Sequence, residues 1–196
     1  MNGNEIVELA RRTYLEELAQ FVVAQARQFE AGAAEVALER RDLPHLFGGH
    51  YRADFVGQRG TGPFPMDLTP DRRLQLETPL EGAAGAMRVR VESLVWDDVE
   101  ISHDAPGDLS GRLGPWFEQW YDPDDRRKPA QPGGPVDVIH WLGVRPGKLL
   151  VDFGSASTGA FWSLAALLRD AAATTATIRE SRPRPWAEAK LTPSKG

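Results

Sequence analysis

Apolar residues near the start of the chain recur at intervals of three and four positions, which predicts a long amphipathic helix. The helical segment covers residues 1–41, with Gly32 as a break or kink before its last part. We expect the apolar stripe to pack on the rest of the domain, with self-association through this helix as the alternative. The stripe consists of Ile6, Leu9, Ala10, Tyr14, Leu18, Phe21, Val22, Ala26 and Phe29.

Residues 42–70 show no such period. This stretch contains four prolines and five glycines among scattered apolar positions. Loops of this length are uncommon in compact domains and are usually functional or mobile. We therefore predict a long Gly/Pro-rich loop that several apolar side chains pin to the body of the protein.

From residue 71 apolar and polar positions alternate, which predicts strands. Two successive units of strand, strand and helix follow, and a short β-branched segment adds a final strand at the edge of the sheet. The predicted strands cover 72–77, 87–101 with a bulge near Ser93, 136–142, 148–153 and 174–178, and the helices cover 109–121 and 158–168, the second with Ser157 as its N-cap.

The predicted fold class is α+β, with an antiparallel or mixed sheet and helices mainly on one face. We expect a single domain over residues 1–180, in which a ββαββαβ body at 71–180 follows the helical segment and the loop. Residues 181–196 are predicted to form a flexible tail.

Composition narrows the possible functions. The 196 residues include 41% hydrophobic residues and no cysteine, and the net charge is −5. The missing cysteine excludes disulfides and thiolate metal sites, and the acidic balance disfavours sequence-independent nucleic-acid binding. Neither a secretory signal nor a membrane-spanning run is evident, so we expect a cytoplasmic protein. Only four of the 23 basic residues are lysine, a bias that suggests a bacterial source with a GC-rich genome.

The glycine-serine loop Gly154–Gly159 is the place to look for catalytic motifs, and it matches none. A P-loop needs lysine and then serine or threonine where this chain has Ala160 and Phe161. The tripeptide at 152–154 has the kinase DFG sequence without the other kinase motifs, and the nearby serines lack the GxSxG context. We interpret this loop as a strand exit and helix cap, with binding of a small anion as the alternative.

The histidines have no recognised zinc spacing. A cluster of His45, His50 or His103 with Asp54 or Asp104 in three dimensions is the alternative. We expect His140 to lie on a strand, where it faces solvent or forms a hydrogen bond at the sheet edge. The sequence therefore predicts no catalytic residue, no metal and no cofactor.

Four aromatic residues fall within six positions of the predicted helix 109–121. One helix rarely buries four such side chains against a single sheet, so we expect some of them to be exposed as anchors of an interface. Acidic residues would form the rim of that interface, with solvated turns as the alternative. The candidate partner interface comprises Trp116, Trp120, Tyr121, Asp122, Asp124, Asp125, Asp97, Asp98 and Glu100.

Three segments carry a resemblance: WFEQWYDPDD at 116–125, VDVIHWLGV at 136–144 and KLLVDFGSAS at 148–157. With these segments, residues 89–178 resemble small bacterial immunity proteins that accompany polymorphic or contact-dependent toxins. The resemblance implies a cytoplasmic protein that neutralises one cognate toxin, and it assigns no role to any residue.

The leading hypothesis is a non-enzymatic binding protein, most closely an immunity-type inhibitor that acts by direct contact with a protein partner. An acidic surface suits a basic partner such as a nuclease. One alternative is a small enzyme or ligand-binding protein with its site between the 42–70 loop and the Gly154–Ser157 loop. Another is a structural subunit that forms homo-oligomers through the N-terminal helix.

Overall fold

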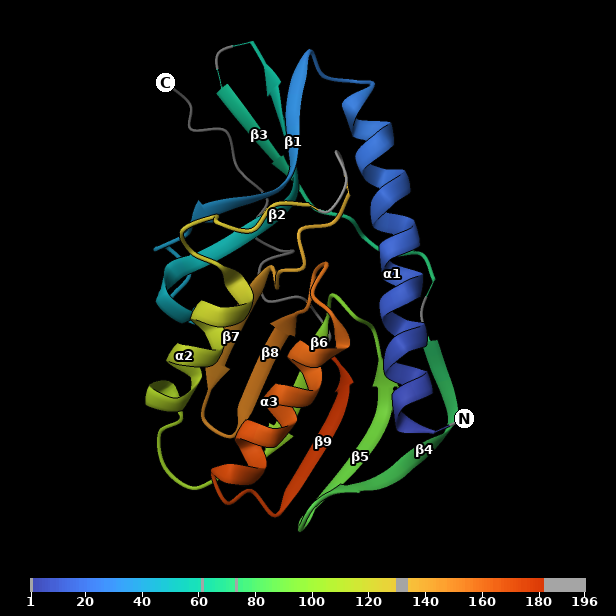
Figure 1. Ribbon diagram of the computed structural model, residues 1–196, viewed down its shortest axis with the longest axis vertical. Coiled ribbons are helices and arrows are strands. Elements are labelled where there is room, and N and C mark those ends of the chain that lie inside the picture. The colour runs from blue at the N-terminus through green and yellow to red at the C-terminus, as the bar shows by residue number, and fades with distance from the viewer. Residues whose placement is uncertain (1, 61, 73, 130–133, 182–196) are drawn as a thin grey trace.

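The computed structural model describes residues 2–60, 62–72, 74–129 and 134–181, which form an α+β fold with two sheets (Figure 1). The helices are α1 (Gly3–Ala26), α2 (Ser110–Tyr121) and α3 (Thr158–Asp170), with a short 3-10 turn η1 (Phe47–Gly49). The strands are β1 (Ala31–Glu39), β2 (His50–Arg59), β3 (Gly62–Met66), β4 (Leu74–Ala84), β5 (Met87–Leu94), β6 (Val99–His103), β7 (Trp141–Arg145), β8 (Lys148–Asp152) and β9 (Thr175–Glu180).

The larger sheet has the strand order β4-β5-β9-β6-β8-β7. Strand β9 pairs parallel with β5 and antiparallel with β6, and the remaining pairs are antiparallel. The sheet is therefore mixed, as predicted. The expectation that the last strand lies at the edge is wrong, because β9 separates β5 from β6. The predicted strand 87–101 consists of two separate strands, β5 and β6, with a turn from Val95 to Asp98 between them.

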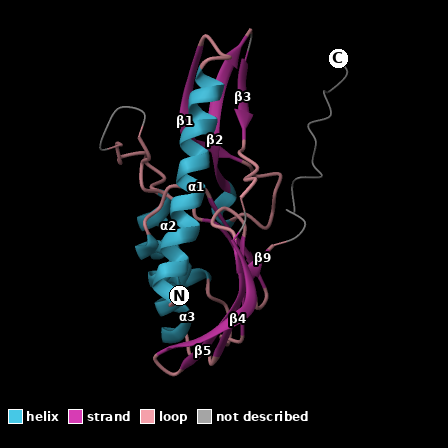
Figure 2. Cartoon of the chain, turned by 90° about the vertical axis from the view of Figure 1, so that its right-hand side faces the viewer, coloured by secondary structure: helices cyan, strands magenta, loops and turns pink. Residues whose placement is uncertain are grey.

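All three helices lie against one face of the larger sheet, which confirms the predicted arrangement (Figure 2). The opposite face carries charged residues, for example Glu100 on β6, which accepts hydrogen bonds from Lys148 and Arg179 on the neighbouring strands. This face is not polar throughout, because Trp141 of β7 and Leu150 of β8 lie on it and form a small buried apolar cluster with Leu46.

Aromatic packing fixes α3 on the sheet. The ring of Trp96 stacks on Phe153 with centroids 4.7 Å apart and lies 6.4 Å from Phe161 of α3. The indole of Trp96 also donates a hydrogen bond of 3.0 Å to the carbonyl of Gly154. These contacts place the end of β8 and the start of α3 at one point of the core.

The N-terminal helix is shorter than predicted, since it ends at Ala26 and residues 31–39 form β1. Its buried positions Ile6, Val7, Ala10, Tyr14 and Leu18 confirm that the stripe packs on the core. Alanine, glutamate and leucine after Gly32 favour a helix by intrinsic propensity. Pairing with β2, in which Val36 lies opposite Ala53, overrides that local preference.

The predicted loop at 42–70 is also wrong, because β2 and β3 account for much of it. With β1 they form a smaller antiparallel sheet beside the second half of α1 (Figure 1). Phe29 packs against Phe55 and Phe64 of this sheet with centroids 6.1 and 6.3 Å away. The predicted tail lies outside the described residues, apart from Ser181.

Candidate functional site

The structure buries the aromatic residues of the predicted interface. The indole nitrogens of Trp116 and Trp120 both donate hydrogen bonds to the hydroxyl of Ser163 on α3, over 2.9 and 3.1 Å. On another side of α2, Phe117 and Tyr121 stack with ring centroids 4.7 Å apart and contact the ring of His50.

Helix α2 can bury all four side chains because it has partners on two sides, α3 and the chain around η1. All four are less than 9% exposed. The expectation of an exposed aromatic remainder is therefore wrong.

The acidic residues of the predicted rim divide into two groups. Asp97, Asp98 and Glu100 are buried. Burial would raise the pKa of Glu100, but its hydrogen bonds to Lys148 and Arg179 hold that pKa below its usual range. These three carboxylates do not form an open docking rim.

The second group follows α2. Asp122 is the left-handed C-cap of the helix, and its carboxylate accepts a hydrogen bond of 2.6 Å from the backbone of Arg127. Asp125 pairs with Arg52 over 3.0 Å and exposed Asp124 pairs with Arg126. Asp122 thus caps the C-terminal end of α2, and Asp125 forms an ion pair beside it.

A buried histidine–carboxylate cluster lies where the two sheets meet. His140, which directly precedes β7, is 1% exposed, so the prediction that it faces solvent or the sheet edge is wrong. Its Nε2 lies 3.0 Å from Oε1 of Glu35. Its Nδ1 lies 3.1 Å from Oδ1 of Asp54, an ion-pair contact rather than an aligned hydrogen bond, and 3.9 Å from Asp152.

Strand register explains why a histidine fits here. Ala34 pairs with Phe55 and Val36 with Ala53, so Glu35 and Asp54 lie opposite each other on β1 and β2. Like charges in directly opposite positions repel. The imidazole between the two carboxylates supplies the opposite charge.

These carboxylates also accept hydrogen bonds from groups outside the imidazole. Asp54 accepts hydrogen bonds from the Tyr14 hydroxyl over 2.6 Å and from the backbone of Leu68 over 2.7 Å. Backbone N–H groups donate to Glu35 and to Asp152 over 2.9 Å in each case. The cluster thus links α1, both sheets and the start of the Gly154 loop into one hydrogen-bonded unit.

Burial alone would lower the pKa of His140, but Asp152, Asp54 and Glu35 outweigh it and raise that pKa well above its ordinary value. Burial would raise the pKa of Glu35 and of Asp54, yet the hydrogen bond of His140 to Glu35 and the close contact of its ring with Asp54 hold both pKa values below their usual range. Burial raises the pKa of Asp152 well above that of an exposed aspartate. The charges of the cluster thus favour the protonated form of His140 and the ionised forms of Glu35 and Asp54, whereas burial disfavours the ionised form of Asp152.

Two further residues show how tightly this region is built. Arg52 is 1% exposed and donates hydrogen bonds to the last carbonyls of α2, those of Tyr121 and Asp122, over 3.1 and 3.3 Å. Gly154 has φ +48°, and a Cβ atom there would lie 2.2 Å from the ring of His140. Ser157 does occupy the N-cap position of α3, although its hydroxyl makes no capping hydrogen bond.

The sequence pattern did not predict this cluster. Its one available signal is that Glu35, His140 and Asp152 each have apolar residues as neighbours on both sides. His45, His50 and His103 are not part of it. Among the described residues, no group of histidine, aspartate or glutamate has a geometry that would hold a metal ion.

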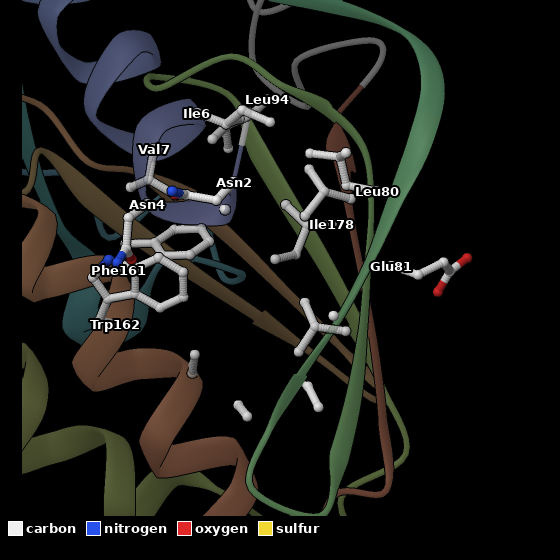
Figure 3. A pocket seen from close by; sticks show the side chains of 17 residues that line it. Asn2, Asn4, Ile6, Val7, Leu80, Glu81, Leu94, Phe161, Trp162 and Ile178 are labelled. Atoms are coloured by element: carbon white, nitrogen blue, oxygen red, sulfur yellow. The ribbon is translucent and has the colours of Figure 1, made fainter.

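An open apolar pocket lies at the other end of the larger sheet (Figure 3). Its volume is about 500 Å³, and it lies between the N-terminus of α1, helix α3 and the strands β4, β5 and β9. Trp162 of α3 lines it and is 39% exposed, an unusual degree for tryptophan. The other lining residues are Asn2, Gly3, Asn4, Ile6, Val7, Leu80, Glu81, Gly82, Ala83, Ala84, Val89, Val91, Leu94, Phe161, Ala165 and Ile178.

Gly82 keeps the floor of this pocket open. It lies opposite Val89, which lines the pocket, so a side chain at position 82 would point to the same face. A Cβ atom there would meet nothing within 4 Å. Exposed Arg88 on β5 directly precedes Val89 and is not among the lining residues, and its side chain belongs to the other face of the sheet.

No helix in the described part of the chain is long and apolar enough to cross a membrane. Comparison with protein-family models, with curated proteins and with solved structures finds no match for this chain.

Proposed function

We propose that this chain is a non-enzymatic binding protein and that the apolar pocket between α1, α3 and β4–β5 is its recognition site. The observation that carries this proposal is the pocket itself, about 500 Å³ in volume with a partly exposed Trp162 in its wall. Ligand sites in proteins are typically concave, largely apolar and about 300–1,000 Å³ in volume. Burying this surface against an apolar group of a target would release binding free energy.

The buried cluster around His140 supports an enzyme less well. It lies where the enzyme alternative places a site, between Asp54 of the 42–70 segment and the Gly154–Ser157 loop. A catalytic group must come within hydrogen-bond reach of its substrate. The imidazole and carboxylates of the cluster are almost fully buried and contact one another, so we assign them to stability.

The test is to fill the pocket with a larger side chain at position 82 of β4, which forms part of its floor. Gly82→Leu adds a branched side chain where space is free, and the control Arg88→Leu places a leucine on the opposite face of the neighbouring strand β5. We expect Nile red to bind the wild-type protein and Arg88→Leu alike, and Gly82→Leu at least about tenfold more weakly, because the leucine at position 82 occupies the apolar volume.

Urea unfolding of both variants shows that each remains folded. Equal dye binding by all three proteins would place the apolar site elsewhere and contradict the proposal.

The narrower form of the proposal is an immunity-type inhibitor in the bacterial cytoplasm. Its support is the resemblance of residues 89–178 described above. In this form the target is a toxin domain, and an apolar side chain of the toxin enters the pocket.

Co-expression with the product of a neighbouring toxin reading frame tests this form. Protection by the wild-type protein and Arg88→Leu, but not by Gly82→Leu, is the expected result. Protection by all three would separate toxin neutralisation from the pocket.

A further inference from the structure

The pocket has one polar end and a long apolar body. Its polar side chains are Asn2 and Asn4 at the start of α1, together with Glu81 on β4. Figure 3 shows that the Glu81 carboxylate points away from the cavity, whereas the two asparagines lie beside Phe161 and Trp162. Polar groups therefore face a ligand at only one end.

The apolar body consists mainly of aliphatic side chains. Leu80, Val89, Val91 and Ile178 form the sheet side, where Gly82 leaves the space above the strand free. Of the 17 lining residues only Glu81 is charged, so a charged group placed deep in the pocket would lose its hydration without gaining a partner.

We propose that this pocket binds a single aliphatic chain of an amphiphile, whose polar head lies at the asparagine end beside the start of α1. The inference rests on the general form of the proposed function and names the class of ligand for the same site, in place of the toxin side chain of the narrower form. A chain of methylenes matches the lining in chemistry, and a head group at Asn2 and Asn4 stays in contact with water. A free fatty acid and a neutral lipid alcohol share this chemistry.

The experiment measures displacement of Nile red by two homologous series, each used below its critical micelle concentration. Hexanol, octanol, decanol and dodecanol form one series, and the corresponding carboxylates form the other. We expect affinity to increase about fourfold for each added methylene, the factor that corresponds to about 0.8 kcal/mol per buried methylene, until the chain fills the cavity. Gly82→Leu should shorten the chain length at which the gain stops or abolish binding, and Arg88→Leu should match the wild type.

The outcomes separate this inference from the proposed function. Tighter binding of the carboxylates identifies a fatty acid, and equal binding of both series identifies a neutral head group; either supports the inference. If Nile red binds in a manner sensitive to Gly82→Leu but neither series displaces it, the aliphatic ligand is wrong and the recognition site stands. If Gly82→Leu has no effect on dye binding, both proposals fail.

Discussion

The cluster around His140 and the pocket beside α3 reverse the usual placement of polar and apolar groups. The cluster holds charged side chains where water does not reach, and the pocket holds aliphatic and aromatic side chains where it does. In the cluster each charged side chain already contacts an oppositely charged one, so the cluster has little capacity to bind a ligand. In the pocket the apolar surface has no cover among the described residues, and binding can still gain free energy there.

This difference predicts separate consequences for mutation. Removing one member of a buried ion pair leaves an uncompensated charge and destabilises the fold. Filling the open pocket changes what can bind and leaves the core intact.

The largest effect is expected from His140→Ala, which leaves Glu35 and Asp54 buried opposite each other without a counter-charge. We expect the free energy of unfolding to fall by about 3–5 kcal/mol, measured by urea denaturation. His103→Ala, at a half-buried histidine outside the cluster, should cost much less. If His140→Ala does not fold, His140→Gln provides the measurement, and a loss below about 1 kcal/mol would show that the cluster is not a stabilising unit.

A matched pair of glycine substitutions contrasts the two regions directly. Gly154→Ala forces a Cβ atom against the His140 ring at a positive φ, and we expect a loss of about 2–4 kcal/mol. Gly82→Ala meets open space in a strand and should stabilise the protein by about 0.5–1 kcal/mol. Thermal and urea unfolding measure the stability of both variants. Changes of the same sign and size in the two variants would contradict the proposed difference between the two regions.

The smallest expected effect is the change in the free energy of unfolding with pH. Because the folded pKa of His140 is raised, its contribution is complete below its unfolded pKa and is lost as pH rises through the folded pKa. The raised pKa of Asp152 acts in the same direction. The lowered pKa values of Glu35 and Asp54 give contributions that are present above their unfolded values and lost as pH falls through the folded ones.

We therefore expect stability to fall from neutral to alkaline pH, by about 1.4 kcal/mol for each unit by which the folded pKa of His140 exceeds its unfolded value. Urea denaturation over a pH series measures this slope. His140→Gln should flatten it and His103→Ala should retain it. A slope that persists in His140→Gln would assign the titration to other groups.

Several elements could be predicted from sequence because their signals are local. The two-residue period gave the hairpins β4–β5 and β7–β8, and the stripe from Ile6 to Leu18 gave the first part of α1. Strand β1 was missed because its residues prefer a helix until β2 pairs with them. The position of β9 was missed because strand order is a long-range property.

The two candidate sites were missed for related reasons. The members of the cluster lie on five segments between Tyr14 and Asp152, and no spacing along the chain links them. The pocket depends on Gly82 and on the way α1 and α3 diverge above the sheet, which leaves no motif in the sequence.

The sequence by itself determined the α+β class, the absence of cysteine chemistry and the abundance of aromatic residues in α2. Only the tertiary structure decided which of these residues are exposed. Whether a side chain is buried depends on what packs against its element. Other parts of the chain pack against α2 on two sides, whereas no described residue covers the strands beside Trp162. The proposed recognition site therefore lies at the uncovered strands and not at the aromatic helix.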